Sequence, residues 1–229
     1  MKQIKKILAF FLLLIFLFLP FSAFAHQPQN IMRTKGLIVV NDPEVSKAYY
    51  GELTGSPQVF RINSQKEFNL YVGLLLPKIP NIEKNLSADI YKINGDNKEL
   101  LVKLFGPSFN WTEFYEPFGG DYYWQGPEYK NNVSAGNYEI EVNNPKNLGK
   151  YSLAIGEKEE FPPNEILRTI KVLPDLKKNF FGVSVLTILK SYTGLALIVT
   201  FVIIVVIILA IILIIKKIKK RNENNINSI

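Results

Sequence analysis

The chain has 229 residues, no cysteine, one histidine and a formal net charge of +7. Between residues 26 and 192, however, 19 Lys and Arg residues balance 19 Asp and Glu residues, so the positive excess lies near the two ends. This distribution argues against a nucleic-acid-binding protein, which needs a basic surface, and the absence of cysteine excludes disulfides and thiol nucleophiles.

The first 25 residues have the features of a secretory signal peptide. Lys2–Lys6 form a basic start, Ile7–Leu19 is an apolar run, and Ala23-Phe24-Ala25 has the small–x–small pattern of a cleavage site. As a helix, the apolar run rises only about 20 Å, whereas the hydrocarbon core of a bilayer is ~30 Å thick. We therefore predict cleavage after Ala25, with an uncleaved membrane anchor as the alternative.

Residues 26–161 have the pattern of short strands separated by turns rich in Asn, Asp, Gly and Pro. The β-rich runs are residues 36–41, 47–53, 58–62, 67–76, 86–93, 99–105, 138–142 and 151–155. So many short strands predict a mainly β fold, with an antiparallel β-sandwich as the extracytoplasmic domain.

One of these runs and one turn between runs carry specific expectations. In run 67–76, Phe68, Leu70 and Val72 alternate with other residues, which predicts a strand with one buried face. Asn94-Gly95 lies between two runs and supplies the positive φ angles that a tight hairpin needs.

Residues 133–156 form a recognisable pair of strands: a Gly-x-Tyr strand, a polar turn and a Gly-x-Tyr-x-Leu strand. The pattern falls on Gly136, Tyr138, Gly149, Tyr151 and Leu153. It resembles the closing hairpin of pre-peptidase C-terminal-type β-sandwich modules, and Asn69–Val72 and Ala88–Tyr91 are similar to earlier strands of such modules. The resemblance covers residues 60–156 and implies a non-catalytic accessory or binding module, although no peptidase domain adjoins it.

Residues 162–192 are expected to form a helical juxtamembrane stalk. Residues 164–173 have apolar side chains on one helical face, and Pro174 should end that helix. The apolar run that follows is too short to span a bilayer. It is typical of an interfacial helix in which Phe180 and Phe181 enter the headgroup region; packing of the segment against the sandwich is the alternative.

Residues 193–215 are 23 residues without a charge, which is enough for a transmembrane helix. Five of the next six residues are basic, so the positive-inside rule places the tail, residues 216–229, in the cytoplasm. The sequence thus predicts a single-pass protein of the cell membrane with its N-terminus extracytoplasmic.

Aromatic residues are densest in residues 109–129, where nine of 21 are Phe, Trp or Tyr. Their rings, brought together by a loop at Gly119-Gly120, would suit contact with a sugar or a partner segment. Core packing is the alternative, because aromatic residues favour strands in any case. The candidate contact residues are Trp111, Tyr115, Tyr122, Tyr123 and Trp124.

His26 is the candidate metal ligand. Cleavage after Ala25 would make it the first residue, and its free α-amine and imidazole would then chelate Cu(II) through two nitrogens. A histidine brace needs a second histidine, however, and the chain has none. An incidental terminal histidine is therefore the competing interpretation.

Enzymatic activity is not expected, because the chain lacks the residues for a cysteine or Ser-His-Asp nucleophile and for a zinc site of the usual ligands. Paired carboxylates, Glu113 with Glu116 or Asp121, remain the one catalytic alternative.

We therefore expect a membrane-anchored binding or accessory module that needs no cofactor and contacts the lipid bilayer and a partner protein or envelope component, but no nucleic acid. A carbohydrate-binding or copper-handling domain is the alternative.

Overall fold

The computed structural model describes the backbone of residues 26–226 and the side chains of residues 26–219. The predicted signal peptide lies outside these residues. The described chain divides into two compact units, one ending at Ser191 and the other consisting of the C-terminal helix.

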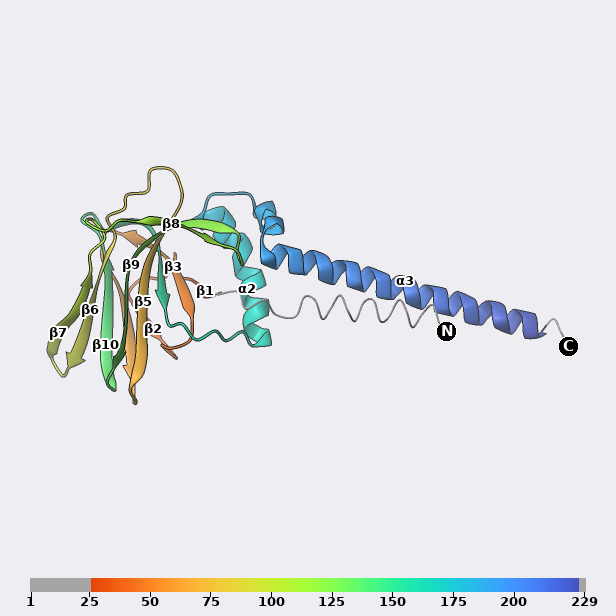
Figure 1. Ribbon diagram of the computed structural model, residues 1–229, viewed down its shortest axis with the longest axis horizontal. Helices are drawn as coiled ribbons and strands as arrows, with labels where there is room; N and C mark the ends of the chain where they lie inside the picture. Colours follow the sequence, from red (N-terminus) through yellow and green to blue (C-terminus); the bar gives the residue numbers. More distant parts are fainter. Residues whose placement is uncertain (1–25, 227–229) are drawn as a thin grey trace. The chain divides into compact units, whose positions relative to one another are not determined.

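The first unit is built around two sheets packed face to face (Figure 1). In spatial order, the six-stranded sheet consists of β1 (Gln27–Asn30), β3 (Lys47–Thr54), β11 (Leu148–Ile155), β5 (Phe68–Pro77), β9 (Asp121–Val133) and β8 (Thr112–Glu116). The five-stranded sheet consists of β2 (Leu37–Val40), β4 (Gln58–Ser64), β10 (Gly136–Asn143), β6 (Ser87–Asn94) and β7 (Asn97–Leu104). The predicted β-sandwich is confirmed.

The sheets are mixed rather than purely antiparallel. β1 runs parallel to β3, with Gln27 opposite Lys47, and β2 runs parallel to β4, with Leu37 opposite Val59. The reason is the path of the first four strands, which alternate between the two sheets. A chain that crosses to the other sheet and returns enters its first sheet again in the original direction, so the strands it places side by side are parallel.

The main core lies between the sheets. Phe68, Leu70 and Val72 are buried while Asn69 and Tyr71 are not, as the alternation predicted. The Asn94-Gly95 hairpin is also found: Asn94 pairs with Asn97, and Gly95 has a φ of 60°.

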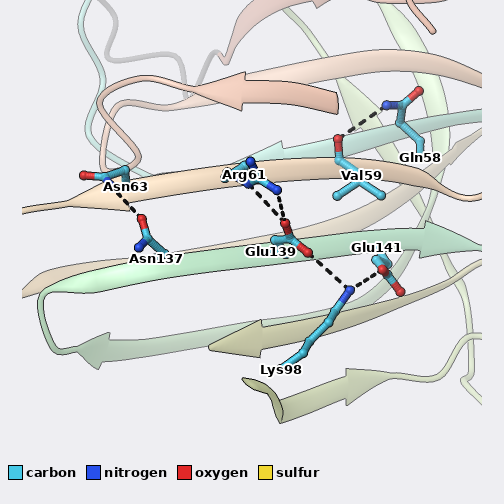
Figure 2. A network of polar contacts seen from close by, with 8 residues as sticks. All are labelled: Gln58, Val59, Arg61, Asn63, Lys98, Asn137, Glu139 and Glu141. Carbon is cyan, nitrogen blue, oxygen red and sulfur yellow. Dashed lines mark hydrogen bonds and ion pairs between the residues drawn. The ribbon is translucent and has the colours of Figure 1, made fainter. Parts of the chain in front are cut away.

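The outer face of the five-stranded sheet carries a network of charged side chains (Figure 2). Arg61 Nη2 lies 2.6 Å from Glu139 Oε1, and Lys98 Nζ lies 3.2 Å from Glu139 Oε2 and also pairs with Glu141. The Arg61 hydrogen bonds lower the pKa of Glu139. This face is therefore solvated, and its charges neutralise one another.

A helical layer covers part of the outer face of the six-stranded sheet. It consists of α2 (Pro163–Asp175), the π-helical turn η1 (Leu176–Phe180) and the 3₁₀ helix η2 (Val185–Lys190). Pro174 does not end the helix as expected; α2 includes it and continues into η1. Pro174 has no backbone N–H and so removes one hydrogen bond from the helix, which is consistent with a change from α-helix to π-helix just after it.

The expectation that Phe180 and Phe181 enter a membrane surface is corrected by the structure, since both are buried. The Phe180 ring lies 5.1 Å from that of Tyr50 on β3, and the Phe181 ring lies 5.4 Å from that of Tyr123 on β9. These edge-to-face contacts form a second core between the helical layer and the sheet. The alternative, packing against the sandwich, is what the structure shows.

The second unit is α3 (Tyr192–Ile226). Within the described residues, the 28-residue stretch Tyr192–Lys219 is the one helical segment long and apolar enough to cross a membrane, and it contains the predicted span. Its large apolar side chains are mostly exposed, as lipid-facing residues would be.

Candidate functional site

The aromatic segment folds into the β8–β9 hairpin, and β8 is the edge strand of its sheet. Tyr115 pairs with Tyr122 and Glu113 pairs with Trp124, so these four side chains share one face. The intervening residues of both strands point to the other face, because side chains alternate along a strand.

Tyr115 and Tyr122 form an exposed aromatic surface. Their side chains are 42% and 50% exposed, with ring centroids 4.8 Å apart and planes inclined at 44°. Lys78, just after β5, places its Nζ 5.5 Å from the Tyr122 centroid and 2.6 Å from Glu113 Oε2. We call Lys78, Glu113, Tyr115 and Tyr122 the tyrosine ledge.

Trp124 adjoins the ledge but is half-buried and packs against the main core. Lys84 Nζ lies 3.2 Å from the centroid of its ring, and Lys78 Nζ lies 5.6 Å from it. A cation already lies over the indole, so its face is not free to stack on a ligand.

Trp111 is a core residue, only 6% exposed, and precedes β8. Its Nε1 donates a hydrogen bond of 2.8 Å to the Gly106 carbonyl. The indole lies against Gly126, where an added Cβ would come within 2.5 Å of it. For Trp111 the core-packing interpretation therefore holds.

Tyr123 is also buried, on the opposite face of the hairpin from the ledge. Its hydroxyl lies 3.0 Å from that of Tyr50. Burial raises the pKa of Tyr123 well above its ordinary value, so this phenol stays protonated. The structure thus brings together Tyr115, Tyr122 and the edge of Trp124, and it separates Trp111 and Tyr123 from them.

A largely buried acidic pair, Glu116 and Asp121, lies on the same face as Tyr123, beneath the helical layer. Glu116 accepts hydrogen bonds from the backbone N–H groups of Phe118, at 2.7 Å, and Gly119, at 2.6 Å. Burial raises the pKa of Glu116 to about 7. Asp121, paired across the hairpin with Glu116, lies 2.6 Å from Lys177 Nζ, and both members of this ion pair are buried.

The catalytic alternative of paired carboxylates is only partly supported by this geometry. Glu113 lies on the ledge face and is paired with Lys78, so it is not near Glu116 or Asp121. The cavity beside Glu116 and Asp121 has a volume of about 30 Å³, which is room for water but not for a sugar ring. Glu116 and Asp121 thus lie close together, but the cavity beside them is too small for a sugar substrate.

His26 lies just before β1. Its Nδ1 is 2.5 Å from the Ser46 hydroxyl, and burial lowers the pKa of the imidazole to about 4. Within residues 26–226 no group of three or more His, Asp or Glu side chains is arranged to hold a metal ion.

Sequence reasoning missed the two lysines that organise this hairpin. Lys78 bridges the ledge, and Lys177 reaches Asp121 across 56 positions of sequence. Lone lysines at such separations carry no sequence signal, because their partners are defined only by the fold.

No protein-family model matches the chain, and no curated protein is similar to it. Among solved structures, the pre-peptidase C-terminal domain of a collagenase from Bacillus anthracis is similar at 15% identity and a TM-score of 0.33, covering 54% of this chain and 96% of that domain. The Eiger TNF of S. frugiperda has a TM-score of 0.22 at 13% identity, covering 44% of this chain and 64% of its own.

A β-glucosidase from Paenibacillus barengoltzii has a TM-score of 0.26 at 14% identity, over 57% of this chain and 13% of the enzyme. The collagenase domain agrees with the resemblance noted in the sequence. At such low TM-scores none of the three assigns the chain to a family or bears on its function.

Proposed function

We propose that this chain is a membrane-anchored, non-catalytic binding module whose tyrosine ledge contacts a partner protein or envelope component outside the cytoplasm. The observation that carries the proposal is the pair of exposed tyrosine rings on an edge hairpin. Tyrosine combines a large apolar ring with a polar hydroxyl and is enriched among the residues that dominate protein interfaces.

The surroundings of the ledge favour a protein partner. The ion pair of Lys78 with Glu113 lies beside the two rings and provides the polar rim typical of interfaces. Tyrosine binds with little loss of side-chain entropy, since it has only two rotatable bonds.

Carbohydrate binding is the weaker alternative. A flat sugar ring stacks best on a flat aromatic surface, but the planes of Tyr115 and Tyr122 are inclined at 44°. Of the two tryptophans, Trp111 is buried and the ring of Trp124 lies under Lys84.

Copper handling by His26 is weaker still. A chelate formed with the histidine's own α-amine uses Nδ1, and here Nδ1 lies at hydrogen-bonding distance from Ser46. Copper would have to displace that contact inside a largely buried environment.

The proposed location rests on sequence and on α3 together. The apolar helix is followed by Lys216, Lys217 and Lys219, which favour the cytoplasmic side of a membrane, and the basic-apolar N-terminus favours export. Because the chain has no cysteine, this topology can be tested by single-cysteine labelling. An impermeant maleimide should label Val183→Cys in intact cells and should not label Ser228→Cys until the cells are permeabilised.

The binding role is tested by crosslinking and pull-down of the full anchored chain from its own membranes. The double variant Tyr115→Ala/Tyr122→Ala should lose a partner that the natural chain retains. Phe105→Ala is the matched control, because Phe105 is a similarly exposed aromatic residue outside the hairpin. Equal recovery of partners by the double variant and the natural chain would refute a role for the ledge.

A further inference from the structure

The edges of the two sheets are not equally protected. An edge strand presents unpaired backbone groups to other chains, and native proteins shield such strands with proline, charge, bulges or a covering element. β1 is shielded twice. It contains Pro28, and the Pro28 carbonyl accepts a hydrogen bond of 2.6 Å from Arg168 on α2.

The strands β7 and β8 are shielded by charge. β7 carries Lys98 and Lys103 and has a bulged register against β6. β8 is only five residues long and carries Glu113 and Glu116. Each of these edges would have to bury charge in order to pair with another strand.

The fourth edge, β2, has none of these features. Its sequence is Leu-Ile-Val-Val, without proline or charge, and its register against β4 is regular. Leu37 and Val39 are 42% and 61% exposed on the outer face, while Ile38 and Val40 face the core. Such an apolar, flat edge favours the addition of another strand.

The charged residues that flank β2 have opposite signs at its two ends. Arg33 and Lys35 precede the strand and Asp42 follows it, and all three are exposed. None of the three is part of an ion pair within the described residues. Lys47 on β3 donates a hydrogen bond of 3.0 Å to the Asp42 backbone carbonyl, which leaves the Asp42 carboxylate without a salt bridge in the described part of the chain. The segment's own residues are thus basic at its start, apolar in its middle and acidic at its end.

This pattern is complementary to itself in one orientation only. In an antiparallel pair the start of one strand meets the end of the other. Asp42 of each copy would then lie near Lys35 and Arg33 of the other, at both ends of the pair. Parallel pairing would instead place like charges together, which is unfavourable.

We propose that β2 pairs antiparallel with β2 of a second copy of this chain, across a two-fold axis. In a register centred on Ile38, Leu37 of one copy faces Val39 of the other on the outer surface, and the five-stranded sheets become continuous. A two-fold axis requires a self-complementary segment, and this one has an apolar centre and opposite charges at its two ends.

The neighbouring surface permits this pairing. The adjoining Arg61–Glu139 ion pair is already neutral, so it does not repel a second copy (Figure 2). A groove of about 540 Å³ beside Met32–Leu37 leaves the start of β2 open to solvent. Because two four-residue strands bury less area than a standard stable interface, the dimer should dissociate on dilution.

The first test is sedimentation equilibrium of the full chain in detergent over a range of concentrations. The natural chain should dimerise reversibly, and Val39→Lys should raise the dissociation constant by about tenfold or more, as buried charge at an edge requires. Leu148→Lys is the matched control, since Leu148 is an equally exposed apolar residue of the other sheet. Both variants leave α3 unchanged, so any association through that helix is common to all samples.

A natural chain that stays monomeric throughout overturns the proposal, and so does an equal effect of Val39→Lys and Leu148→Lys. A thermal unfolding curve for each variant shows whether it is folded; both sites are exposed, so both should be. In membranes, a short thiol crosslinker should join chains carrying Val39→Cys and leave chains carrying Leu148→Cys as monomers, and the reverse result counts against pairing at β2.

The second test concerns the charges and separates a second copy from an unrelated partner. Asp42→Asn alone should weaken the dimer, because it removes an attraction. In an Arg33→Glu/Lys35→Glu chain the same substitution should strengthen the dimer, because it removes a repulsion. Asn suits the positive φ of 46° at this position, so the backbone is not strained. The same sign of effect in both chains would overturn the antiparallel arrangement.

Discussion

Lys177 Nζ lies 2.6 Å from Asp121 Oδ1, and this buried ion pair joins the helical layer to the first residue of β9. The next residue along β9 is Tyr122, on the opposite face, within the ledge. The helical layer therefore fixes the strand that presents the ledge. Burial raises the pKa of Asp121, while the hydrogen bond and charge of Lys177 oppose that rise.

We expect Lys177→Met to destabilise the fold by about 3–5 kcal/mol, because it leaves Asp121 as an unpaired buried charge beside Glu116. Thermal and urea unfolding, followed by tryptophan fluorescence, measure the loss. Lys178→Met is the matched control, since Lys178 is the exposed neighbour on the same turn and should change stability by less than about 0.5 kcal/mol. Similar losses for the two variants would contradict a structural role for the pair.

The helical layer should be necessary for a soluble first unit. A chain of residues 26–191 should fold and stay in solution. A chain ending at residue 161 exposes the surface around Tyr50 and Tyr123 that Phe180 and Phe181 cover. The shorter chain should therefore aggregate or melt at a lower temperature, which gel filtration and circular dichroism would show; equal behaviour of the two chains would mean that the layer is dispensable.

Most of the sandwich could be predicted because its strands carry their own signals. The alternation at Phe68–Val72 and the turn at Asn94-Gly95 depend only on neighbouring residues, and the structure has both. The strand β1, with the sequence Gln-Pro-Gln-Asn, was missed because it has no apolar alternation. It is held instead by its pairing with β3 and by contacts from α2.

The pH dependence of stability should be governed in part by Glu116. Its pKa is about 7 in the folded chain and 4.5 ordinarily, so the folded state holds a proton that the unfolded state has lost between these values. The stabilisation from this group is complete below pH 4.5 and is lost as the pH rises to 7. His26 acts in the opposite sense, because its lowered pKa of about 4 costs stability as the pH falls below 6.5.

Comparison with Glu116→Gln separates the effect of the Glu116 carboxyl on the pH dependence of stability from the effect of His26. Between pH 5 and 8, the natural chain should lose on the order of 1–3 kcal/mol relative to the variant. The amide has one acceptor fewer for the Phe118 and Gly119 N–H groups, so the variant is less stable throughout, and only the difference in pH slope is informative. Glu113→Gln, on the exposed face, should keep the natural slope. Parallel pH profiles for all three chains would count against a raised Glu116 pKa.

The site was predicted less well than the fold, and the reason is physical. Composition identifies an aromatic segment, but which rings are exposed depends on what covers each face of the hairpin. Tyr122 and Tyr123 are adjacent in sequence, but Tyr122 faces solvent, whereas Tyr123 is buried against Phe181. The covering residues come from a distant part of the chain, so no local pattern distinguishes the two tyrosines.

This contrast gives the last prediction. Tyr123→Ala should destabilise the fold by about 3–5 kcal/mol, since it empties a buried site between β9 and the helical layer. Tyr122→Ala should cost less than about 1 kcal/mol, because a half-exposed ring leaves no cavity. Tyr123→Phe should cost about 0.5–1.5 kcal/mol for the lost hydroxyl contact with Tyr50. Urea unfolding of these three variants measures the loss of stability in each and checks that Tyr123→Ala loses the most. A Tyr122→Ala loss as large as that of Tyr123→Ala would mean that Tyr122 is a packing residue and would contradict its role as an exposed contact residue.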